Sequence, residues 1–273
     1  MARRARVDAE LVRRGLARSR EHAVELISAG RVLIAGTVAV KPATAVETGT
    51  PLIVREEPDE VSWASRGAHK LLGALEAFEP QGLSVAGKRC LDAGASTGGF
   101  TDVLLSRGAR EVAAVDVGYG QLIWRLQNDD RVQVYDRTNV RNIMPETIGG
   151  TVESVVGDLS FISLGLVLPA LAACAADGAD LLPMVKPQFE VGKERVGSGG
   201  VVRDPALRAE VVREVAAVAG ALGLRTQGVV ASPLPGPSGN VEYFLWLRKV
   251  GTFEYDAAQV EALVARAVEE GPQ

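Results

Sequence analysis

The 273-residue sequence is poor in the residues that build cross-linked or metal-bound proteins, with two cysteines, two histidines and three methionines. Cys90 and Cys174 lie far apart in apolar runs, so we expect buried free thiols rather than a disulfide framework. His22 and His69 have no partners at metal-ligand spacing, so we predict no metal site. No apolar run is long enough for a membrane span, and the charged residues 1–8 are not followed by the apolar stretch of a secretory signal. We therefore expect a cytoplasmic protein.

Charge is distributed unevenly along the chain. The net charge is −4, yet residues 1–46 hold nine basic and four acidic residues, a net charge of +5 that leaves −9 for the remainder. A basic N-terminal module on an acidic body is typical of a nucleic-acid-binding protein with a separate working domain. The alternative is a solvated arginine surface with no partner.

Residues 1–59 are predicted to form a small α+β domain. Apolar periodicity, caps and glycine stops predict helices at 8–14 and 20–29 and short strands at 31–34, 37–40 and 52–54. With the runs 13–20, 23–36 and 40–42, this pattern resembles an S4 RNA-binding domain. The resemblance implies basic contacts to folded RNA, most of them to phosphate, from Arg4, Arg6, Arg14, Arg18, Arg20 and Lys41.

A polar linker is expected at 60–66, between the small domain and a larger domain at 67–273. The segment 56–60, which overlaps the start of this linker, is itself polar and contains a proline, as expected of a connection between domains. Trp63 follows, and we expect its ring to pack between the two modules. A stacking platform for a base is the alternative.

The larger domain alternates between predicted strands and helices. Strands are expected at 88–93, 112–115, 132–135, 154–156, 180–185, 226–231 and 241–247, and helices at 67–78, 99–107, 121–126, 164–175, 205–222 and 257–268. Alternation of this kind predicts an α/β fold around a parallel sheet. The loop between the last two strands is too short for a helix, so these strands should pair antiparallel. A mostly parallel sheet with an antiparallel last strand is the Rossmann-like layout of class I methyltransferases.

A glycine-rich turn at 94–99 joins the first strand of this domain to a helix. The glycines, Gly94, Gly98 and Gly99, do not have the G-x-G-x-x-G spacing of a dinucleotide site. Asp92 at the strand end suits an amino-acid or ribose group better than a pyrophosphate, so we expect S-adenosylmethionine rather than NAD. The alternative is a βα turn with no ligand.

Polar residues recur at the carboxyl ends of the predicted strands, the edge at which open α/β sheets bind ligands. Asp116 is placed to accept the hydroxyls of an adenosine ribose, and Asp136 with Asn139 to reach the adenine amino group. Phe161 either covers the cofactor or packs in the core. The candidate cofactor residues are Asp92, Gly94, Ala95, Ser96, Thr97, Gly98, Gly99, Phe100, Asp116, Asp136, Asn139 and Phe161.

Two lysines and two acids should converge at the same edge. Asp158 and Lys186 end neighbouring predicted strands, Glu242 lies on the strand beside Lys186, and Lys70 lies on the first helix of the domain. A buried ammonium group is costly unless it is paired, so Lys186 needs a carboxylate. The alternative is a set of surface ion pairs.

These motifs, together with the segments 65–71, 116–122, 158–163, 185–190 and 235–243, resemble the TlyA family, which is linked to the FtsJ-type ribose methyltransferases. The resemblance implies a Lys-Asp-Lys-Glu tetrad, which falls on Lys70, Asp158, Lys186 and Glu242. It implies S-adenosylmethionine-dependent 2′-O-methylation of cytidine in 16S and 23S ribosomal RNA, and an effect on susceptibility to ribosome-targeting cyclic peptide antibiotics. In this hypothesis Lys186 activates the 2′-hydroxyl, either as a neutral base or as a cation that lowers the hydroxyl pKa. Asp158 orients Lys186 and the methyl donor, and Lys70 and Glu242 hold the ribose.

The segment 187–203 has no periodicity and contains Lys193, Arg195 and several glycines, which favours a loop that RNA orders over an inert connection. Ribosomal RNA or ribosomal subunits are the expected partners, with no membrane and no obligate protein partner. Three other functions stay open: a non-catalytic RNA-binding assembly factor, a membrane-active haemolysin, which is a historical label of the family, and a nicotinamide-dependent oxidoreductase. The glycine spacing disfavours the last of these.

Overall fold

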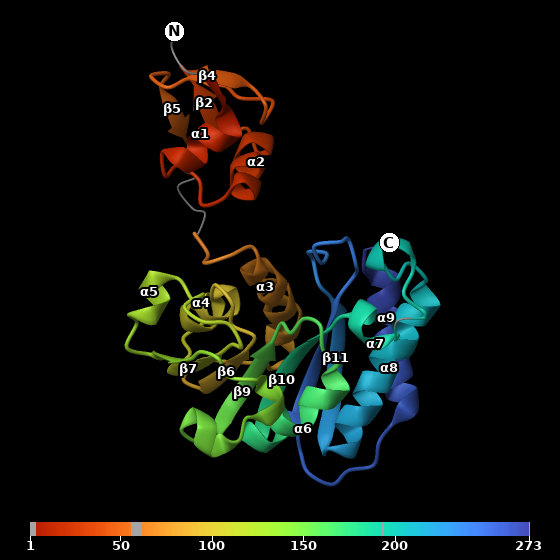
Figure 1. The fold of residues 1–273 in the computed structure, drawn as a ribbon. Helices are drawn as coiled ribbons and strands as arrows, with labels where there is room; N and C mark the ends of the chain where they lie inside the picture. Colours follow the sequence, from red (N-terminus) through yellow and green to blue (C-terminus); the bar gives the residue numbers. More distant parts are fainter. Residues whose placement is uncertain (1–3, 56–61, 193, 273) are drawn as a thin grey trace. The chain divides into compact units, whose positions relative to one another are not determined.

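The computed structural model describes residues 4–55, 62–192 and 194–272. The chain divides into two compact units, Met1–Ser62 and Trp63–Gln273, which we describe separately (Figure 1). The linker expected at 60–66 begins with residues 60 and 61, which lie outside the described residues, as do residues 56–59 at the end of the expected first domain. The boundaries 1–59 and 67–273 stay our prediction.

The first unit combines helices with two small antiparallel sheets. Its elements are β1 (Arg4–Arg6), α1 (Val7–Arg13), α2 (Arg20–Ser28), β2 (Val32–Ile34), β3 (Thr37–Val38), β4 (Ala45–Glu47) and β5 (Leu52–Val54). β2 pairs with β3 and β5, and β1 pairs with β4. Ser19 caps α2 as expected, because its hydroxyl accepts from the His22 backbone N–H at 3.2 Å. The apolar side chains of α1 and α2, Leu11 and Ile27 among them, form one buried cluster with those of the strands.

The second unit is an α/β domain, and its sheet has the expected layout. The strands are β6 (Arg89–Ala93), β7 (Glu111–Val115), β8 (Val132–Tyr135), β9 (Val152–Gly157), β10 (Ala175–Val185), β11 (Leu224–Ala231) and β12 (Tyr243–Lys249). Their order across the sheet is β11-β12-β10-β9-β6-β7-β8. β12 is antiparallel to both neighbours, whereas β10, β9, β6, β7 and β8 run parallel.

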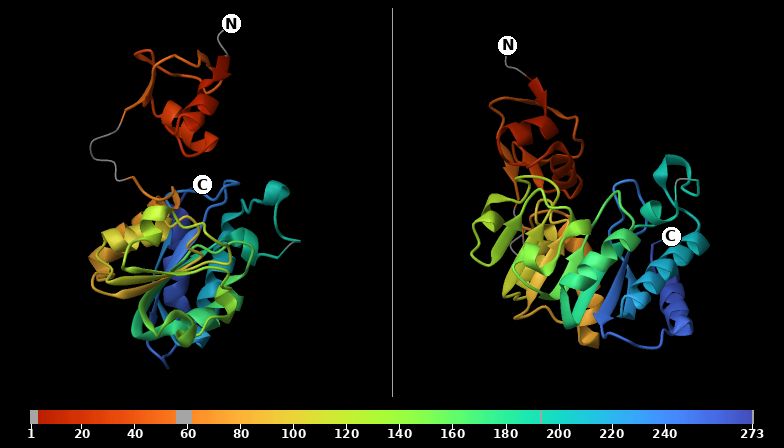
Figure 2. Two further views of the ribbon diagram at one scale, coloured as in Figure 1. Left: turned by 60° about the vertical axis from the view of Figure 1, so that its left-hand side comes forward. Right: turned by 60° about the horizontal axis from the view of Figure 1, so that its bottom comes forward.

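Helices cover both faces of this sheet (Figures 1 and 2). One face carries α3 (Gly67–Phe78), α4 (Gly99–Ser106) and α5 (Trp124–Gln127), and the other carries α6 (Leu164–Cys174), α8 (Pro205–Ala221) and α9 (Ala257–Glu270). Short elements complete the unit: α7 (Pro187–Glu190), η1 (Glu79–Gln81), η2 (Val140–Asn142), η3 (Pro145–Ile148) and η4 (Ser198–Gly200). Each face buries its own apolar cluster against the sheet.

Several expected boundaries were wrong. β10 begins at Ala175 rather than at residue 180, and its pairing with β9 shifts register between Ala175 and Asp180. Residues 177–178, Asp and Gly, do not have the apolar pattern of a strand, so the sequence did not indicate this first part of β10. The strand expected at 241–247 begins at Tyr243, so Glu242 precedes it. The helix expected at 121–126 begins at Trp124. The segment 187–203 is not wholly irregular, because it contains α7 and η4.

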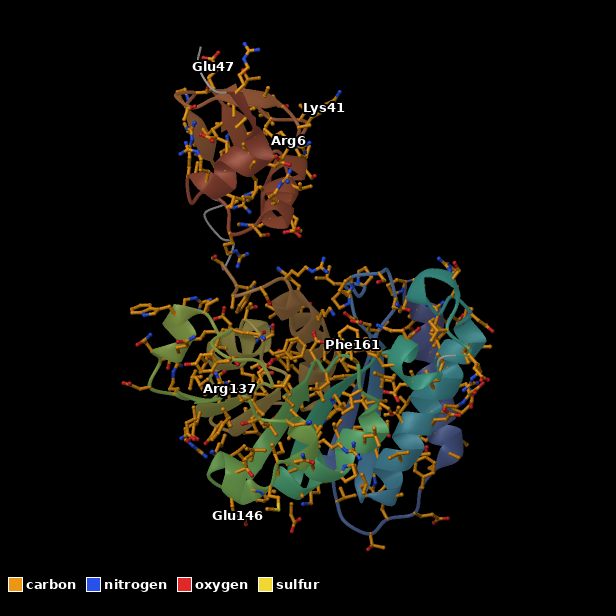
Figure 3. All side chains as sticks on the ribbon, in the orientation of Figure 1. Arg6, Lys41, Glu47, Arg137, Glu146 and Phe161 are labelled. Carbon is orange, nitrogen blue, oxygen red and sulfur yellow. The ribbon has the colours of Figure 1, made fainter. Side chains whose placement is uncertain are left out.

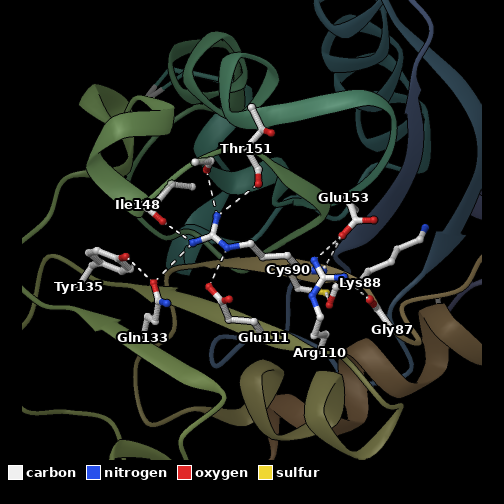
Figure 4. A network of polar contacts seen from close by, with 12 residues as sticks. Gly87, Lys88, Cys90, Arg110, Glu111, Gln133, Tyr135, Ile148, Thr151 and Glu153 are labelled. Carbon is white, nitrogen blue, oxygen red and sulfur yellow. Dashed lines mark hydrogen bonds and ion pairs between the residues drawn. The ribbon is translucent and has the colours of Figure 1, made fainter.

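The amino ends of the strands carry a structural network rather than a site (Figure 4). Arg89 donates to Glu111 Oε1 at 2.7 Å and to the carbonyl oxygens of Gly150, at 3.0 Å, and Ile148. A guanidinium that is shared among a carboxylate and two carbonyls has its donors satisfied. Arg89 therefore ties the chain after η3 to β6 and β7.

The two cysteines lie in apolar surroundings, one in each of the two apolar clusters of the second unit. Cys90 and Cys174 are buried free thiols, and burial raises the pKa of Cys90 to about 12 and that of Cys174 to about 11. Within residues 4–55, 62–192 and 194–272, no group of three His, Cys, Asp or Glu side chains is arranged to hold a metal ion. Across the same residues, no helix combines the length and the apolar character needed to cross a membrane.

Candidate active site

The glycine-rich turn lies where β6 ends and α4 begins, and its glycines are needed for packing within the protein. Gly94 has φ +89°, and a Cβ there would lie 3.0 Å from the Asp158 carbonyl oxygen. A Cβ on Gly99 would lie 3.0 Å from the backbone nitrogen of Ala68. The turn is thereby held against the end of β9 and the start of α3, the elements that carry Asp158 and Lys70.

Asp92 is the buried acid at the base of this turn. Its side chain is inaccessible to solvent, and Oδ2 accepts from the Thr101 hydroxyl at 2.7 Å. Oδ1 is also buried and has no hydrogen-bond partner among the described residues. Burial raises the Asp92 pKa to about 7. A buried acceptor with no partner is a place where a ligand donor group fits.

Asp116 follows β7 and joins two loops through its carboxylate. Oδ2 accepts from the Ser96 N–H at 2.8 Å, and Oδ1 accepts from the Gly118 N–H at 2.7 Å. Each carboxylate oxygen can accept a second hydrogen bond, so the residue can also receive the hydroxyls of a ribose. Asp116 therefore shapes the glycine-rich turn as well as being a candidate ligand contact.

Ala95, Gly98, Gly99 and Phe100 are buried, whereas Asp136, Asn139 and Phe161 are in more open positions. Asp136 Oδ2 accepts from the Gly120 N–H at 2.9 Å, and Asn139 uses its side-chain oxygen to accept from the Arg141 N–H at 3.0 Å. Phe161 is 91 % exposed with φ +64°, so the alternative of a core phenylalanine was wrong (Figure 3). Its ring centroid lies 5.1 Å from that of Phe189 in α7.

The four charged residues predicted to converge form one continuous chain of ion pairs. Lys70 Nζ donates to Glu242 Oε2 at 2.6 Å and lies 3.7 Å from Asp158 Oδ2. Lys186 Nζ lies 2.6 Å from Asp158 Oδ1. The side chains come from α3, from the end of β9, from the end of β10 and from the residue before β12.

This ion-pair chain is largely shielded from water. Lys70 and Lys186 are each 6 % exposed and Glu242 is 1 % exposed. The alternative of surface ion pairs was therefore wrong. Two ammonium groups beside two carboxylates compensate one another, and the low exposure strengthens each interaction over its value in water.

Comparison with known proteins decides the family. The family of FtsJ-like methyltransferases matches residues 63–249, and the S4 domain family matches residues 5–52. The chain belongs to the TlyA family of FtsJ-like methyltransferases. It is 65 % identical over its full length, and that of the relative, to the Mycobacterium tuberculosis 16S/23S rRNA (cytidine-2′-O)-methyltransferase TlyA.

Two further relatives carry the haemolysin name. The Brachyspira hyodysenteriae protein Hemolysin A is 35 % identical over 87 % of this chain and 97 % of its own length. A solved structure of a hemolysin from Streptococcus thermophilus is 39 % identical, with a TM-score of 0.75 over 99 % of this chain and 98 % of that one. The family and the sheet confirm the expected methyltransferase fold and the S4-type first domain.

The TlyA-family site includes polar residues that the sequence did not single out. Lys186 Nζ donates to Ser160 Oγ at 2.9 Å, and Gln188 Nε2 donates to Glu242 Oε1 at 3.3 Å. Met184 Sδ lies 3.9 Å from Lys70 Nζ. Ser160 and Gln188 each lie two positions from a tetrad residue, which was the available signal.

The predicted RNA contacts in the first unit are arranged around two buried acids. Arg6 and Arg20 reach Asp8 Oδ2 at 2.7 and 3.1 Å. Arg14 pairs with Glu10 at 2.7 Å and also donates to the Thr50 carbonyl oxygen at 2.8 Å, so it holds the fold of the unit together.

The other basic candidates differ in how they are held. Arg4, Arg18 and Lys41 are all exposed, and Arg4 lies 3.7 Å from Glu47. In the second unit Arg195 pairs with Glu210 and donates to the Val191 carbonyl oxygen at 3.1 Å. Lys193 lies outside the described residues.

Proposed function

We propose that this enzyme methylates the 2′-oxygen of cytidine in 16S and 23S ribosomal RNA. The observation that carries the proposal is the buried Glu242–Lys70–Asp158–Lys186 chain beside the glycine-rich turn. The M. tuberculosis relative, whose name states this reaction, supports the choice of nucleotide.

S-adenosylmethionine is the proposed methyl donor, and it supplies an electrophilic methyl group on a sulfonium. The residues that would hold it fit its polar groups. The partnerless Asp92 Oδ1 can accept from an ammonium group, and the Asp116 carboxylate can accept from ribose hydroxyls. Asp136 and Asn139 would reach the adenine amino group, and Phe161 would cover the adenine or the methionine portion.

Lys186 is the proposed activating group. Its ammonium is held by Asp158 and Ser160, which leaves a third N–H to donate to the 2′-oxygen. An ammonium group that donates to a hydroxyl oxygen stabilises the negative charge that develops there when the hydroxyl loses its proton. The O–H proton is then released to solvent as the oxygen–methyl bond forms and the sulfur–methyl bond breaks.

Lys70 and Glu242 complete the proposed site by fixing Asp158 and contacting the ribose. Because the four side chains already hold one another in place, the substrate oxygen meets an ordered group and not one that must reorganise. The basic first unit, through Arg4, Arg6, Arg18, Arg20 and Lys41, would supply affinity for the RNA backbone.

The proposal is tested by mass spectrometry of ribosomal RNA nucleosides after incubation of unmodified subunits with the enzyme and the methyl donor. We expect 2′-O-methylcytidine from both RNAs. Tight binding of S-adenosylmethionine with no methylated nucleoside would contradict it, and would favour the RNA-binding assembly factor. We place this activity in the cytoplasm, where its substrate is made.

An effect on antibiotic susceptibility follows from the proposed reaction. A methyl group on ribosomal RNA changes the surface that a ribosome-binding cyclic peptide contacts. We therefore expect deletion and Lys186→Ala strains to share one altered susceptibility. A change in the deletion strain alone would assign the effect to the protein and not to the methyl group.

A further inference from the structure

A pocket of about 400 Å³ lies beside the proposed active site, on the α8 side of the sheet edge. Its walls are residues 201–203 before α8, Arg208 of α8, and the loop 238–241 before β12. Asn240 fastens the two loops together, because its side chain accepts from the Val202 N–H and donates to the Gly200 carbonyl oxygen, both at 2.9 Å. The pocket is therefore built by hydrogen bonds between its walls.

Arg208 is the unusual residue of this pocket. It is 3 % exposed, and Nη1 donates to the Pro272 carbonyl oxygen at 3.2 Å. Nε is buried and has no hydrogen-bond partner in the part of the chain that the structure describes. Within that part, no carboxylate forms an ion pair with Arg208. A buried guanidinium without a counter-charge is costly, so the site favours an anion.

The other walls add groups that an oxyanion can use. Arg203 is exposed at the pocket mouth, and Ser238 supplies a hydroxyl. Two guanidinium groups and a hydroxyl are donors suited to phosphate, whose oxygens accept from the planar fork of arginine. The pocket therefore has the chemistry of a phosphate site.

The start of β12 joins this pocket to the proposed catalytic residues. Val241 lines the pocket and Glu242 belongs to the tetrad. Burial raises the pKa of Tyr243, and the nearby Arg208 guanidinium opposes that rise, so Tyr243 lies on the Arg208 side of the segment. Successive residues of an extended chain face opposite sides, so one segment presents the tetrad on one side and the pocket on the other. In RNA the 2′-hydroxyl that would be methylated is flanked by backbone phosphates.

We propose that the Arg203–Arg208 pocket binds a backbone phosphate of the RNA substrate close to the target nucleotide. The identity of the strand rests on the proposed function, whereas the preference for phosphate rests on the pocket alone. Seating a phosphate there would fix the register of the ribose at Lys186.

The first test is an inorganic phosphate titration of the full-length protein at constant ionic strength, with chloride as the comparison anion. We expect phosphate to raise the melting temperature of the native protein saturably, and Arg208→Gln and Arg203→Ala to lose the effect. Arg213→Ala is the matched control, since Arg213 lies on the same helix but pairs with Glu261 at 2.6 Å. Equal stabilisation of all four proteins, or by chloride, would overturn the phosphate site.

The second test measures RNA methylation and RNA binding by the Arg203→Ala variant. The Arg203 side chain is exposed and donates to the Ser198 carbonyl oxygen at 3.3 Å, so we expect the variant to fold. We expect KM for RNA to rise about tenfold. A plot of log affinity against log salt concentration should become shallower, with the magnitude of its negative slope reduced by roughly 0.7–0.9, as for the loss of one phosphate contact. A neutral methylphosphonate can also replace, one at a time, each phosphate near the target nucleotide. It should weaken RNA binding by the native enzyme at one position and RNA binding by the Arg203→Ala variant at none.

The outcomes separate the two proposals. Phosphate stabilisation with an unchanged KM and salt slope would mean that the pocket takes free phosphate, which overturns the RNA assignment. If the native protein methylates no RNA, the proposed function fails, and RNA affinity with its salt slope still decides the pocket. Should Arg208→Gln not fold, Arg203→Ala carries both tests.

Discussion

The two units differ in whether the cation of an ion pair is exposed or buried. In the first unit Asp8 and Glu10 are buried at 2 % exposure, while the arginines that they hold reach the surface. In the second unit the cations themselves, Lys70 and Lys186, are buried at 6 % exposure. An exposed cation on a buried acid is ordered yet accessible to a polyanion, whereas a buried cation is reserved for a substrate that enters the site.

Buried acids in the two units also differ in their pKa values. Hydrogen bonds from Arg13 and Arg14 lower the Glu10 pKa to about 2, and Arg6 holds the Asp8 pKa well below its usual range. Asp92 has no cationic partner, and burial raises its pKa to about 7. The first unit therefore keeps its acids ionised at neutral pH, while the second holds one acid near its midpoint.

The strongest way to break this comparison is to remove a buried cation. Lys186→Ala should lower kcat by roughly 10²–10⁴, the usual contribution of a positioned acid–base group, with S-adenosylmethionine affinity nearly unchanged. Single-turnover methylation and calorimetric cofactor binding measure the two quantities. Lys88→Ala is the control, because it breaks a 2.9 Å lysine–aspartate pair with Asp180 at the amino end of β6, whereas the tetrad lies at the carboxyl ends of the parallel strands. Comparable loss in both variants would show that Lys186 acts only through stability.

The next effect concerns the buried acid that lacks a cation. Because the Asp92 pKa rises from 3.8 to about 7 on folding, the unfolded chain ionises first as pH increases. Stability should therefore fall between about pH 4 and pH 7, by up to about 4 kcal/mol, and level off above. Asp92→Asn should flatten this dependence in denaturant titrations.

Asp177→Asn is the control for that experiment, since it removes a carboxylate that is fully exposed, at 102 % of the reference area. Its pH dependence should follow that of the native chain. A native stability that rises from pH 4 to pH 7, with Asp92→Asn rising equally, would show that Asp92 ionises normally in the fold.

Prediction from sequence succeeded where one simple rule places residues. Carboxyl ends of neighbouring parallel strands meet at one edge, so Asp158 and Lys186 could be paired from the order of the strands alone. Glu242 followed from the antiparallel last strand, even though the strand itself begins one residue later. Strand order relates three members of the tetrad, whereas Lys70 lies on a helix and was assigned to the tetrad through the resemblance to the FtsJ-type enzymes.

Prediction failed where the deciding contact is distant in sequence. β1 is a three-residue charged strand whose partner β4 is some forty positions away, so no local pattern marks it. Local sequence also does not reveal the packing of the glycine-rich turn, because the backbone atoms that would lie 3.0 Å from a Cβ at Gly94 and Gly99 belong to Asp158 and Ala68. The sequence around Phe161 did not indicate that its side chain is exposed, because an aromatic residue after a strand is as common in a core as at a ligand site.

The third prediction separates ordered arginines from charge alone. Asp8→Asn makes the net charge more positive by one but releases Arg6 and Arg20 from their common carboxylate. If ordered guanidinium groups recognise the RNA, affinity should fall about ten- to thirtyfold despite the more positive charge. Glu10→Gln changes the charge equally and releases Arg13, which is not among the predicted RNA contacts, while Arg14 stays held by the Thr50 carbonyl oxygen, so the RNA affinity of this variant should change little. Tighter RNA binding by both variants would mean that net charge decides.

The smallest expected effect sharpens the role of the buried cation. Ser160→Ala removes one of the two groups that hold Lys186 Nζ, while Asp158 stays at 2.6 Å. We expect kcat to fall about three- to tenfold with KM for RNA unchanged, since one hydrogen bond of about 1 kcal/mol is lost and the charge is kept. Ser160→Thr keeps the hydroxyl and should recover most of the rate. Loss of rate in Ser160→Thr equal to that in Ser160→Ala would assign the effect to packing, and Asp158 alone would then orient the lysine.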